Sequence, residues 1–222
     1  MIKAVIFDMY ETLITLFESS LYFGTQIAID AGIPEEEFLA LWTPKEHDRT
    51  IGKITLEETL EYILKEKQCY SLETFNKIVN KRKKSKKESF EHLHLEIIPL
   101  LEELKKRNIK IGLISNCFSE EVEAIKNSQL FEYFTATYLS YEQGLQKPEK
   151  EIFYRCMESL GVFPEDCLYV GDGGSYELET ASDIGMKAIQ AVWYLKEGTL
   201  QPSKRKRDFV QAESPLEILQ YI

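Results

Sequence analysis

The feature that most constrains the fold is a short apolar run near the N-terminus that stops at an acidic residue. Residues 4–7 read Ala-Val-Ile-Phe, and Asp8 follows at once. Four apolar residues suffice for a strand buried on both faces of a parallel sheet, but they are too few for a helix. In an open α/β sheet, ligands bind in the crevice beyond the carboxyl ends of the strands. The sequence therefore predicts a buried strand that brings Asp8 to a site at the edge of a sheet.

Further short apolar runs that end in polar residues recur in the second half of the chain. The expected strands after the first are 109–114, 136–139, 167–170 and 187–192, with an edge strand near 209–211. The stretches between them favour helices, including an amphipathic helix over 97–107 and a last helix over 215–221. Strands that alternate with helices, without tight hairpin signals, are typical of an α/β fold with a doubly wound parallel sheet.

The segment between about residue 15 and residue 92 has a different pattern. Apolar residues such as Leu56 and Leu60 recur at helical spacing, and strand-like alternation is scarce. Thr55 followed by Glu58 predicts a capping box at the start of the helix that carries these leucines. The segment is therefore expected to be a helical insert of about four helices. The breakers that divide it lie at 32–34, 43–44 and 51–52.

The composition narrows the range of partners. The chain has 222 residues, of which 44% are hydrophobic and 29% charged, and its formal net charge of −10 argues against nucleic acid as the principal partner. Two basic runs, 81–87 and 204–207, are expected to be solvated surface. The four cysteines form no C-x-x-C pair, and no apolar run approaches the length of a membrane span. We therefore expect a cytoplasmic protein with reduced thiols and no membrane association, whereas the sequence does not indicate its oligomeric state.

Several polar residues follow the expected strands and carry chemistry. A carboxylate such as Asp8 can attack phosphorus or an alkyl carbon and form a covalent intermediate. Ser115 and Asn116 follow the second strand, where a hydroxyl and a free backbone N–H can hold a phosphoryl oxygen. Asp172 ends the fourth strand, and it would lie beside Asp8 if the two strands were neighbours. Two carboxylates with a backbone carbonyl are the hard oxygen ligands that Mg²⁺ prefers.

These positions resemble four motifs, in the same order, of the haloacid dehalogenase (HAD) superfamily. The residues from Asp8 onward resemble the first motif, Asp-x-Asp-x-Thr/Val, and Ser115 resembles the second. Lys147, which precedes a Pro, resembles the third, and Asp172 after Gly, followed by Glu177, resembles the fourth. The resemblance covers nearly the whole chain. It implies a Rossmann-like HAD core over residues 1–14 and 93–222, with an inserted α-helical cap domain over residues 15–92 that selects the substrate.

The resemblance also implies a role for each position. Asp8 would be the nucleophile, and Lys147 would neutralise both the nucleophile and the transferring group, so that its ammonium is expected to lower the pKa of Asp8. The implied catalytic residues are Asp8, Tyr10, Ser115 and Lys147, the implied substrate-binding residues are Thr12, Ser115, Asn116 and Lys147, and the implied Mg²⁺ ligands are Asp8, Tyr10 through its backbone carbonyl, Asp172 and Glu177.

Tyr10 departs from the first motif, whose second Asp serves as general acid and base. A phenol, with a pKa near ~10, donates a proton but is a poor base at neutral pH. Glu11 and His47 are possible substitutes, although a surface carboxylate and a solvated histidine are the commoner roles. The leading hypothesis is a Mg²⁺-dependent phosphatase that forms an aspartyl-phosphate, acts on a small phosphorylated metabolite and favours good leaving groups.

Tyr10 also resembles the tyrosine in the motif Asp-x-Tyr-Gly-Thr of 2-haloacid dehalogenases, which work without metal and release a halide that needs no proton. Such an enzyme would use a cap arginine for the substrate carboxylate, and Arg49 is the early candidate, whereas Asp172 with Glu177 favours Mg²⁺ and phosphoryl chemistry. Two further alternatives are phosphonate cleavage with a cap lysine such as Lys53, and a non-catalytic protein that binds a phospho-ligand or a protein partner. Four cap aromatics are expected to line a pocket or to form the core of the cap: Phe17, Tyr22, Phe23 and Trp42.

Overall fold

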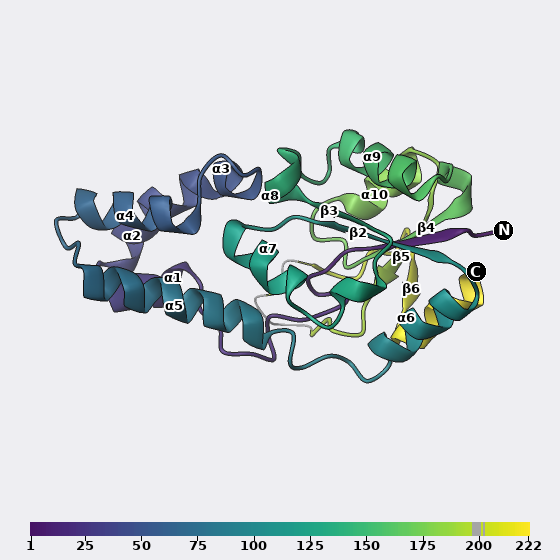
Figure 1. Cartoon of the computed structure of the whole chain (residues 1–222), viewed down its shortest axis with the longest axis horizontal. Coiled ribbons are helices and arrows are strands. Elements are labelled where there is room, and N and C mark those ends of the chain that lie inside the picture. The colour runs from purple at the N-terminus through teal and green to yellow at the C-terminus, as the bar shows by residue number, and fades with distance from the viewer. Residues whose placement is uncertain (197–200, 202) are drawn as a thin grey trace.

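A six-stranded parallel sheet lies at the centre of the computed structural model, which describes residues 1–196, 201 and 203–222 (Figure 1). The strand order is β3-β2-β1-β4-β5-β6, so that β1 pairs with β2 on one side and with β4 on the other. The strands are β1 (Ala4–Phe7), β2 (Lys110–Ser115), β3 (Ala136–Leu139), β4 (Cys167–Gly171), β5 (Lys187–Ala191) and β6 (Val210–Ala212). The doubly wound parallel sheet predicted from the sequence is confirmed.

Helices cover both faces of the sheet. Val5 and Phe7 of β1 face one apolar core, whereas Ala4 and Ile6 face the other. This two-sided burial explains why the strand is apolar throughout rather than alternating. The first core is covered by α6 (Ile97–Lys106), α7 (Ser119–Lys126) and η4 (Pro215–Tyr221), and the second by α9 (Lys150–Leu160) and α10 (Glu177–Asp183). The short elements are η2 (Phe131–Tyr133), α8 (Ser140–Gln143) and η3 (Pro164–Asp166).

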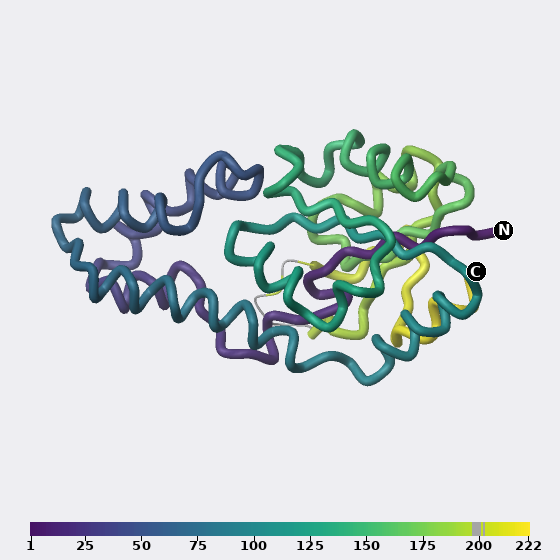
Figure 2. Tube along the Cα trace, viewed as in Figure 1, coloured from purple at the N-terminus to yellow at the C-terminus, as the bar shows by residue number. Residues whose placement is uncertain are grey.

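A separate helical unit lies between β1 and α6, at the end of the molecule opposite to the two termini (Figures 1 and 2). Its side chains pack on one another in a third apolar core, which includes Phe38, Leu60 and Ile63. The unit consists of α1 (Gly24–Ala31), α2 (Glu35–Trp42), η1 (Thr43–Lys45), α3 (Glu46–Thr50), α4 (Leu56–Glu66) and α5 (Leu72–Glu88).

The number of helices in this unit differs from the expectation of about four. Residues 24–88, all of which the structure describes, form five α-helices and one 3₁₀ helix. The missed break separates α4 from α5, where Gln68 has a φ of +54° and neither Gly nor Pro marks the turn. The predicted capping box is confirmed, because Glu58 N–H donates to Thr55 Oγ1 at 3.1 Å and Thr55 N–H donates to Glu58 Oε2 at 2.8 Å.

The helical unit contacts the sheet-bearing part of the chain through two pairs of helices, α5 with α7 and α3 with α8. Gly52 follows α3 with a φ of +74°, and a Cβ atom there would lie only 2.0 Å from the Tyr141 carbonyl oxygen. A residue without a side chain is therefore required where the loop meets α8. Within the described part of the chain, no helix combines the length and the apolar character needed to cross a bilayer.

Candidate active site

The site forms where β1, β2 and β4 end side by side. Asp8 follows β1, and its backbone N–H donates to Val170 O of β4 at 2.9 Å. Its carboxylate accepts a hydrogen bond from Met9 N–H at 2.7 Å, and the side chain is 9% exposed. Because the three strands are parallel neighbours, their carboxyl ends bring Asp8, Asn116 and Asp172 to one cavity.

Lys147 reaches this cavity from the loop between α8 and α9. Its Nζ lies 2.6 Å from Asp8 Oδ1, and both side chains are buried. The backbone of Lys147 is held by the Asn116 side chain, which accepts from Lys147 N–H at 2.7 Å and donates to Lys147 O at 3.0 Å. The Lys147–Pro148 peptide bond is cis. Asn116 therefore positions Lys147 against Asp8 and also lines the cavity itself.

Three carboxylates converge at the same edge. Asp8, Asp172 and Glu177 each place an oxygen within 4.8 Å of the others, and all three side chains are buried. Both oxygens of Glu177 accept backbone hydrogen bonds, from Gly173 N–H at 2.6 Å and Ser175 N–H at 2.7 Å. The glycine before Asp172 is required by close packing, since a Cβ on Gly171 would lie 2.8 Å from Glu177 Oε1.

Burial dominates the electrostatics of these groups. Burial raises the pKa of Asp8 to about 6, although Lys147 acts to lower it. Burial, with the charges of Asp8 and Glu177, raises the pKa of Asp172 to about 7. Burial would lower the pKa of Lys147, but the nearby carboxylates outweigh it and raise this pKa above its usual value. Lys147 lowers the pKa of Asp8 as expected, but the net pKa is raised, because desolvation of the carboxylate exceeds the attraction of the ammonium.

The converging carboxylates fit a hard divalent cation. Carboxylate oxygens are the donors that Mg²⁺ prefers, and a cation would relieve the repulsion that raises the pKa of Asp172. Asp172 is itself fixed in place, since Gln190 Nε2 donates to its backbone carbonyl at 2.8 Å and Ser203 donates from its hydroxyl to Oδ2. Gln190 and Ser203 were not predicted from the sequence, because both lie far from Asp172 along the chain.

Three predicted site residues lie differently from the others. The ring of Tyr10 lines the cavity, but its hydroxyl is buried and has no hydrogen-bond partner among the described residues. The side chains of Thr12 and Ser115 are fully buried, and the described residues that line the cavity include neither. Ser115 Oγ donates to Asn116 O at 3.4 Å, and the Thr12 carbonyl accepts from the Trp193 indole at 2.8 Å. Direct substrate contact by Thr12 and Ser115 therefore stays a prediction.

Glu11 is a cavity residue rather than a surface carboxylate. It is 8% exposed and adopts a φ of +55°, a conformation that Gly takes with less strain. Its carboxylate accepts hydrogen bonds from Thr15 Oγ1 at 2.8 Å, Leu16 N–H at 2.9 Å and Gln201 Nε2 at 2.9 Å. Three donors therefore hold the side chain in place despite the strained backbone. The sequence indication of an unusual role was the position of Glu11, which stands where the dehalogenase motif Asp-x-Tyr-Gly-Thr has Gly.

Of the residues that the sequence suggested for the cap, some line the cavity and others lie outside it. Phe17 and Phe23 line the cavity of about 370 Å³, whereas Tyr22 and Trp42 belong to the core of the helical unit. His47 lines a second cavity of about 510 Å³, which shares Asn116 and Ser175 with the first. Arg49 is buried against Glu120. The described residues that line the first cavity include neither Arg49 nor Lys53, whose side chain is 62% exposed.

Comparisons with known proteins identify the family of this chain. The family model of haloacid dehalogenase-like hydrolases matches residues 2–185. An N-acylneuraminate-9-phosphatase of Rattus norvegicus is 31% identical over 131 residues, which is 58% of this chain and only about half, 52%, of that protein. The pyrophosphatase PpaX of Bacillus cereus is 27% identical over 213 residues, which cover 94% of this chain and 91% of that protein.

Solved structures of low sequence identity share the fold. A HAD family enzyme from Bacteroides thetaiotaomicron, in complex with magnesium and inorganic phosphate, matches with a TM-score of 0.66 and 22% identity over 90% of this chain and 96% of that one. An L-2-haloacid dehalogenase from Xanthobacter autotrophicus matches with a TM-score of 0.63 and 18% identity over 99% and 98% of the two chains. Because the family model covers most of the sequence and the fold agrees with it, this chain belongs to the haloacid dehalogenase-like hydrolase family.

Proposed function

We propose that the protein is a Mg²⁺-dependent phosphatase of small phosphorylated metabolites that works through an aspartyl-phosphate on Asp8. The observation that carries the proposal is the pairing of Asp8 with Lys147 at 2.6 Å, beside the buried acids Asp172 and Glu177. A nucleophile, a fixed cation and a cluster of hard oxygen ligands are the parts that phosphoryl transfer needs. The phosphatases among the relatives support the same chemistry.

In the proposed reaction, an oxygen of Asp8 attacks phosphorus and the bond from phosphorus to the leaving oxygen breaks. The leaving group departs with the bonding electrons and takes up a proton from solvent or from a weak acid at the site. A water oxygen then attacks the phosphorus of the aspartyl-phosphate, and the bond from phosphorus to the Asp8 oxygen breaks. The water gives up a proton to solvent, phosphate is released, and the Asp8 carboxylate is restored. Lys147 balances negative charge on the phosphoryl oxygens, and Asn116 keeps Lys147 in place.

Asp8, Asp172 and the backbone carbonyl of Tyr10 would bind Mg²⁺ directly, and Glu177 would hold a water ligand of the ion. When bound, Mg²⁺ neutralises charge on the carboxylates and on the transferring phosphoryl group. Glu177 suits an indirect role, because both of its oxygens already accept backbone hydrogen bonds.

Tyr10 is proposed to shape the cavity rather than to move protons. Burial and the charge of Glu121 raise the pKa of its phenol well above the usual value, so it is a still weaker acid than an exposed tyrosine. The segment 15–92 is proposed to act as the cap, because Phe17 and Phe23 from this segment complete the cavity wall above the core residues 1–14 and 93–222.

The dehalogenase alternative receives less support. Its substrate carboxylate would need a cation at the cavity, but Arg49 lies between Trp42 and Phe118 and pairs with Glu120. Phosphonate cleavage through Lys53 is disfavoured for a similar reason, since this side chain is exposed and pairs with Asp48. Asp172 and Glu177 also have no evident use in a reaction without metal.

The test is phosphate release from monoesters with good and poor leaving groups, with Mg²⁺ or with a chelator. Asp8→Asn is the blank, because it keeps the shape of the side chain but removes its nucleophilic charge. Mg²⁺-dependent release that Asp8→Asn abolishes would support the proposal. Absence of release from all esters, together with halide release from 2-haloacids, would favour the dehalogenase, and ligand binding without turnover would favour the non-catalytic alternative.

A further inference from the structure

The cavity beside Asp8 has walls of two kinds. The residues that would face a phosphoryl group are polar and charged, and they include Asp8, Lys147 and Asp172. The rest of the lining is mainly apolar, since it contains the rings of Tyr10 and Phe23. Leu16 and Phe17, which belong to the segment between β1 and α1, complete this apolar wall. A bound phosphate monoester would therefore place its leaving group against carbon atoms.

The described lining of the cavity offers a single cationic side chain to an anionic ligand. Of the described residues that line it, only Lys147 is a Lys or Arg, and Lys147 already pairs with Asp8 at 2.6 Å. The sequence of residues 197–200 and 202 contains neither Lys nor Arg. A second anionic group on the substrate would thus lack a counter-charge, and desolvation of an unpaired anion is costly.

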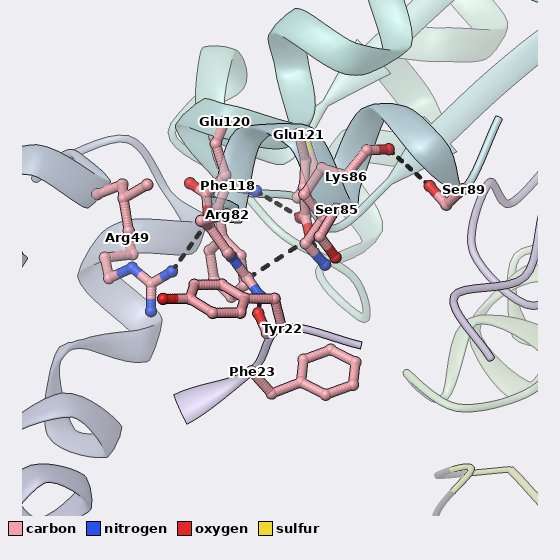
Figure 3. A network of polar contacts seen from close by, with 12 residues as sticks. Tyr22, Phe23, Arg49, Arg82, Ser85, Lys86, Ser89, Phe118, Glu120 and Glu121 are labelled. Atoms are coloured by element: carbon pink, nitrogen blue, oxygen red, sulfur yellow. Dashed lines mark hydrogen bonds and ion pairs between the residues drawn. The ribbon is translucent and has the colours of Figure 1, made fainter. Parts of the chain in front are cut away.

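The cations that the helical unit could offer are directed elsewhere (Figure 3). Arg82 Nε lies 2.9 Å from Glu120 Oε1, and Lys86 Nζ lies 2.6 Å from Glu121 Oε1. Arg49 pairs with Glu120 at 3.4 Å. The side chains of Arg49, Arg82 and Lys86 are only 1–4% exposed, and none of the three lines the cavity. Their charges are balanced by α7 at the junction between the helical unit and the core.

Lys86 comes nearest to the apolar wall, but it lies behind that wall. Its Nζ is 5.6 Å from the centroid of the Tyr10 ring and 5.4 Å from that of Phe23. Both rings line the cavity, whereas Lys86 does not. The ammonium therefore contacts the rings and Glu121 instead of the substrate, and it supports the wall without giving it a positive surface.

The charged group that the wall does present is negative. Glu11 lines the cavity with a carboxylate fixed by hydrogen bonds from Thr15, Leu16 and Gln201. A second carboxylate or phosphate on the leaving group would meet this charge and would find no second cationic side chain among the described lining residues. Like charges at short range in a partly buried site repel strongly.

We infer that the enzyme selects phosphate monoesters with an uncharged, apolar leaving group and discriminates against substrates with a second anionic group, such as pyrophosphate or a carboxylate-bearing ester. The inference rests on the proposed phosphatase function. The inferred substrate preference differs from the substrates named for two of the relatives, an N-acylneuraminate phosphate and pyrophosphate.

The experiment compares phenyl phosphate, 4-carboxyphenyl phosphate and inorganic pyrophosphate as substrates of the whole chain with Mg²⁺. The two aryl esters have the same shape apart from the carboxylate, and the electron-withdrawing carboxylate does not make the phenol a poorer leaving group. We expect phenyl phosphate to exceed each of the other two in kcat/KM by about tenfold or more. The Leu16→Lys variant, which adds a cation to the wall, should narrow the ratio between the aryl esters, and so should Glu11→Gln.

The matched control is Leu21→Lys, which adds the same charge at an exposed residue of the same segment outside the cavity lining. It should leave the ratio unchanged. Equal or preferred use of 4-carboxyphenyl phosphate or pyrophosphate by the wild-type protein would overturn the inference and leave the phosphatase function intact. If p-nitrophenyl phosphate also gave no Mg²⁺-dependent release above the Asp8→Asn blank, the proposed function would fail, and the inference with it.

Discussion

Tyr10 illustrates how much the surroundings of a residue decide its chemistry. Its hydroxyl is buried without a hydrogen-bond partner among the described residues, and burial with the charge of Glu121 raises its pKa well above the usual value. The phenol therefore neither accepts nor releases a proton readily near neutral pH. Its ring, which lines the cavity, is the part with an evident use.

We predict that Tyr10→Phe keeps kcat within about threefold of the wild-type value, since general acid–base help is worth about 10²–10⁴-fold when it is present. Its free energy of unfolding should not fall, because the change removes a buried hydroxyl that has no partner among the described residues. Steady-state kinetics and urea unfolding measure the two quantities. A loss of kcat by a hundredfold or more would show that the hydroxyl takes part in the reaction.

Lys147→Met should lower kcat by about 10²–10³-fold, because it removes the cation that lies 2.6 Å from Asp8. It should also move the acidic limb of the pH profile to higher pH, since Lys147 is the group that holds down a pKa of Asp8 already raised to about 6 by burial. Lys150→Met is the control, as this lysine is exposed and pairs with Asp183 at 3.5 Å. Equal kinetics in the two variants would contradict the assigned role.

The packing of α5 on α7 buries charged residues that the sequence pattern predicts to be solvated. The basic run 81–87 was expected to be solvated, and this is wrong for Arg82 and Lys86, which are buried. These two residues are four apart and therefore share one face of α5, which packs on α7 where Glu120 and Glu121 lie. The four-residue spacing of Arg82 and Lys86 indicates that they share a helix face. Their burial could not be predicted from this spacing, because the acidic partners are nearly forty residues away in the sequence.

Glu120→Gln should lower the free energy of unfolding by about 3–5 kcal/mol, because Arg82 and Arg49 would lose a buried counter-charge. Glu61→Gln breaks the exposed pair with Lys65 on α4 and should cost under about 1 kcal/mol. Urea unfolding of the two variants measures the difference. Similar small losses would mean that the cluster between α5 and α7 does not hold the helical unit to the core.

The strands were predictable because burial on both faces leaves a continuous apolar run, as in residues 4–7. The break between α4 and α5 was not, since Gln68 takes a left-handed conformation that Gly or Asn adopts more often. At the site, the sequence predicts Asp8 and Asp172 because each follows an apolar strand. It predicts Lys147 and Glu177 because each lies in a segment that resembles a family motif. Their mutual distances, the burial of Glu11 and the support of Asp172 by Ser203 depend on the strand order and on long-range packing.

In the folded molecule, the buried acids Asp8 and Asp172 couple stability to pH and to metal. Asp8 and Asp172 have pKa values raised to about 6 and about 7, so between about pH 4 and pH 7 the folded protein binds protons that the unfolded chain does not. The stability of the metal-free protein should therefore fall as the pH rises through this range. The sign is opposite to that of a carboxylate whose pKa is lowered on folding.

Mg²⁺ competes with these protons for the same oxygens. We predict that saturating Mg²⁺ raises Tm more at about pH 8 than at about pH 5, where Asp8 and Asp172 are protonated. Calorimetry at both pH values, with and without chelator, measures the difference. An Asp172→Asn variant should lose most of the increment at the higher pH, and an increment independent of pH would argue against binding at these acids.

If Asp8 carries the phosphoryl group during turnover, mass spectrometry of the peptide that contains Asp8 should detect that group. The protein would be mixed with p-nitrophenyl phosphate and quenched in acid within the first turnover, with Mg²⁺ or with chelator. We expect one phosphoryl group on Asp8 with Mg²⁺, none with chelator and none in Asp8→Asn. Phosphate release with Asp8 unmodified, or with the phosphoryl group on another residue, would rule out an aspartyl-phosphate on Asp8.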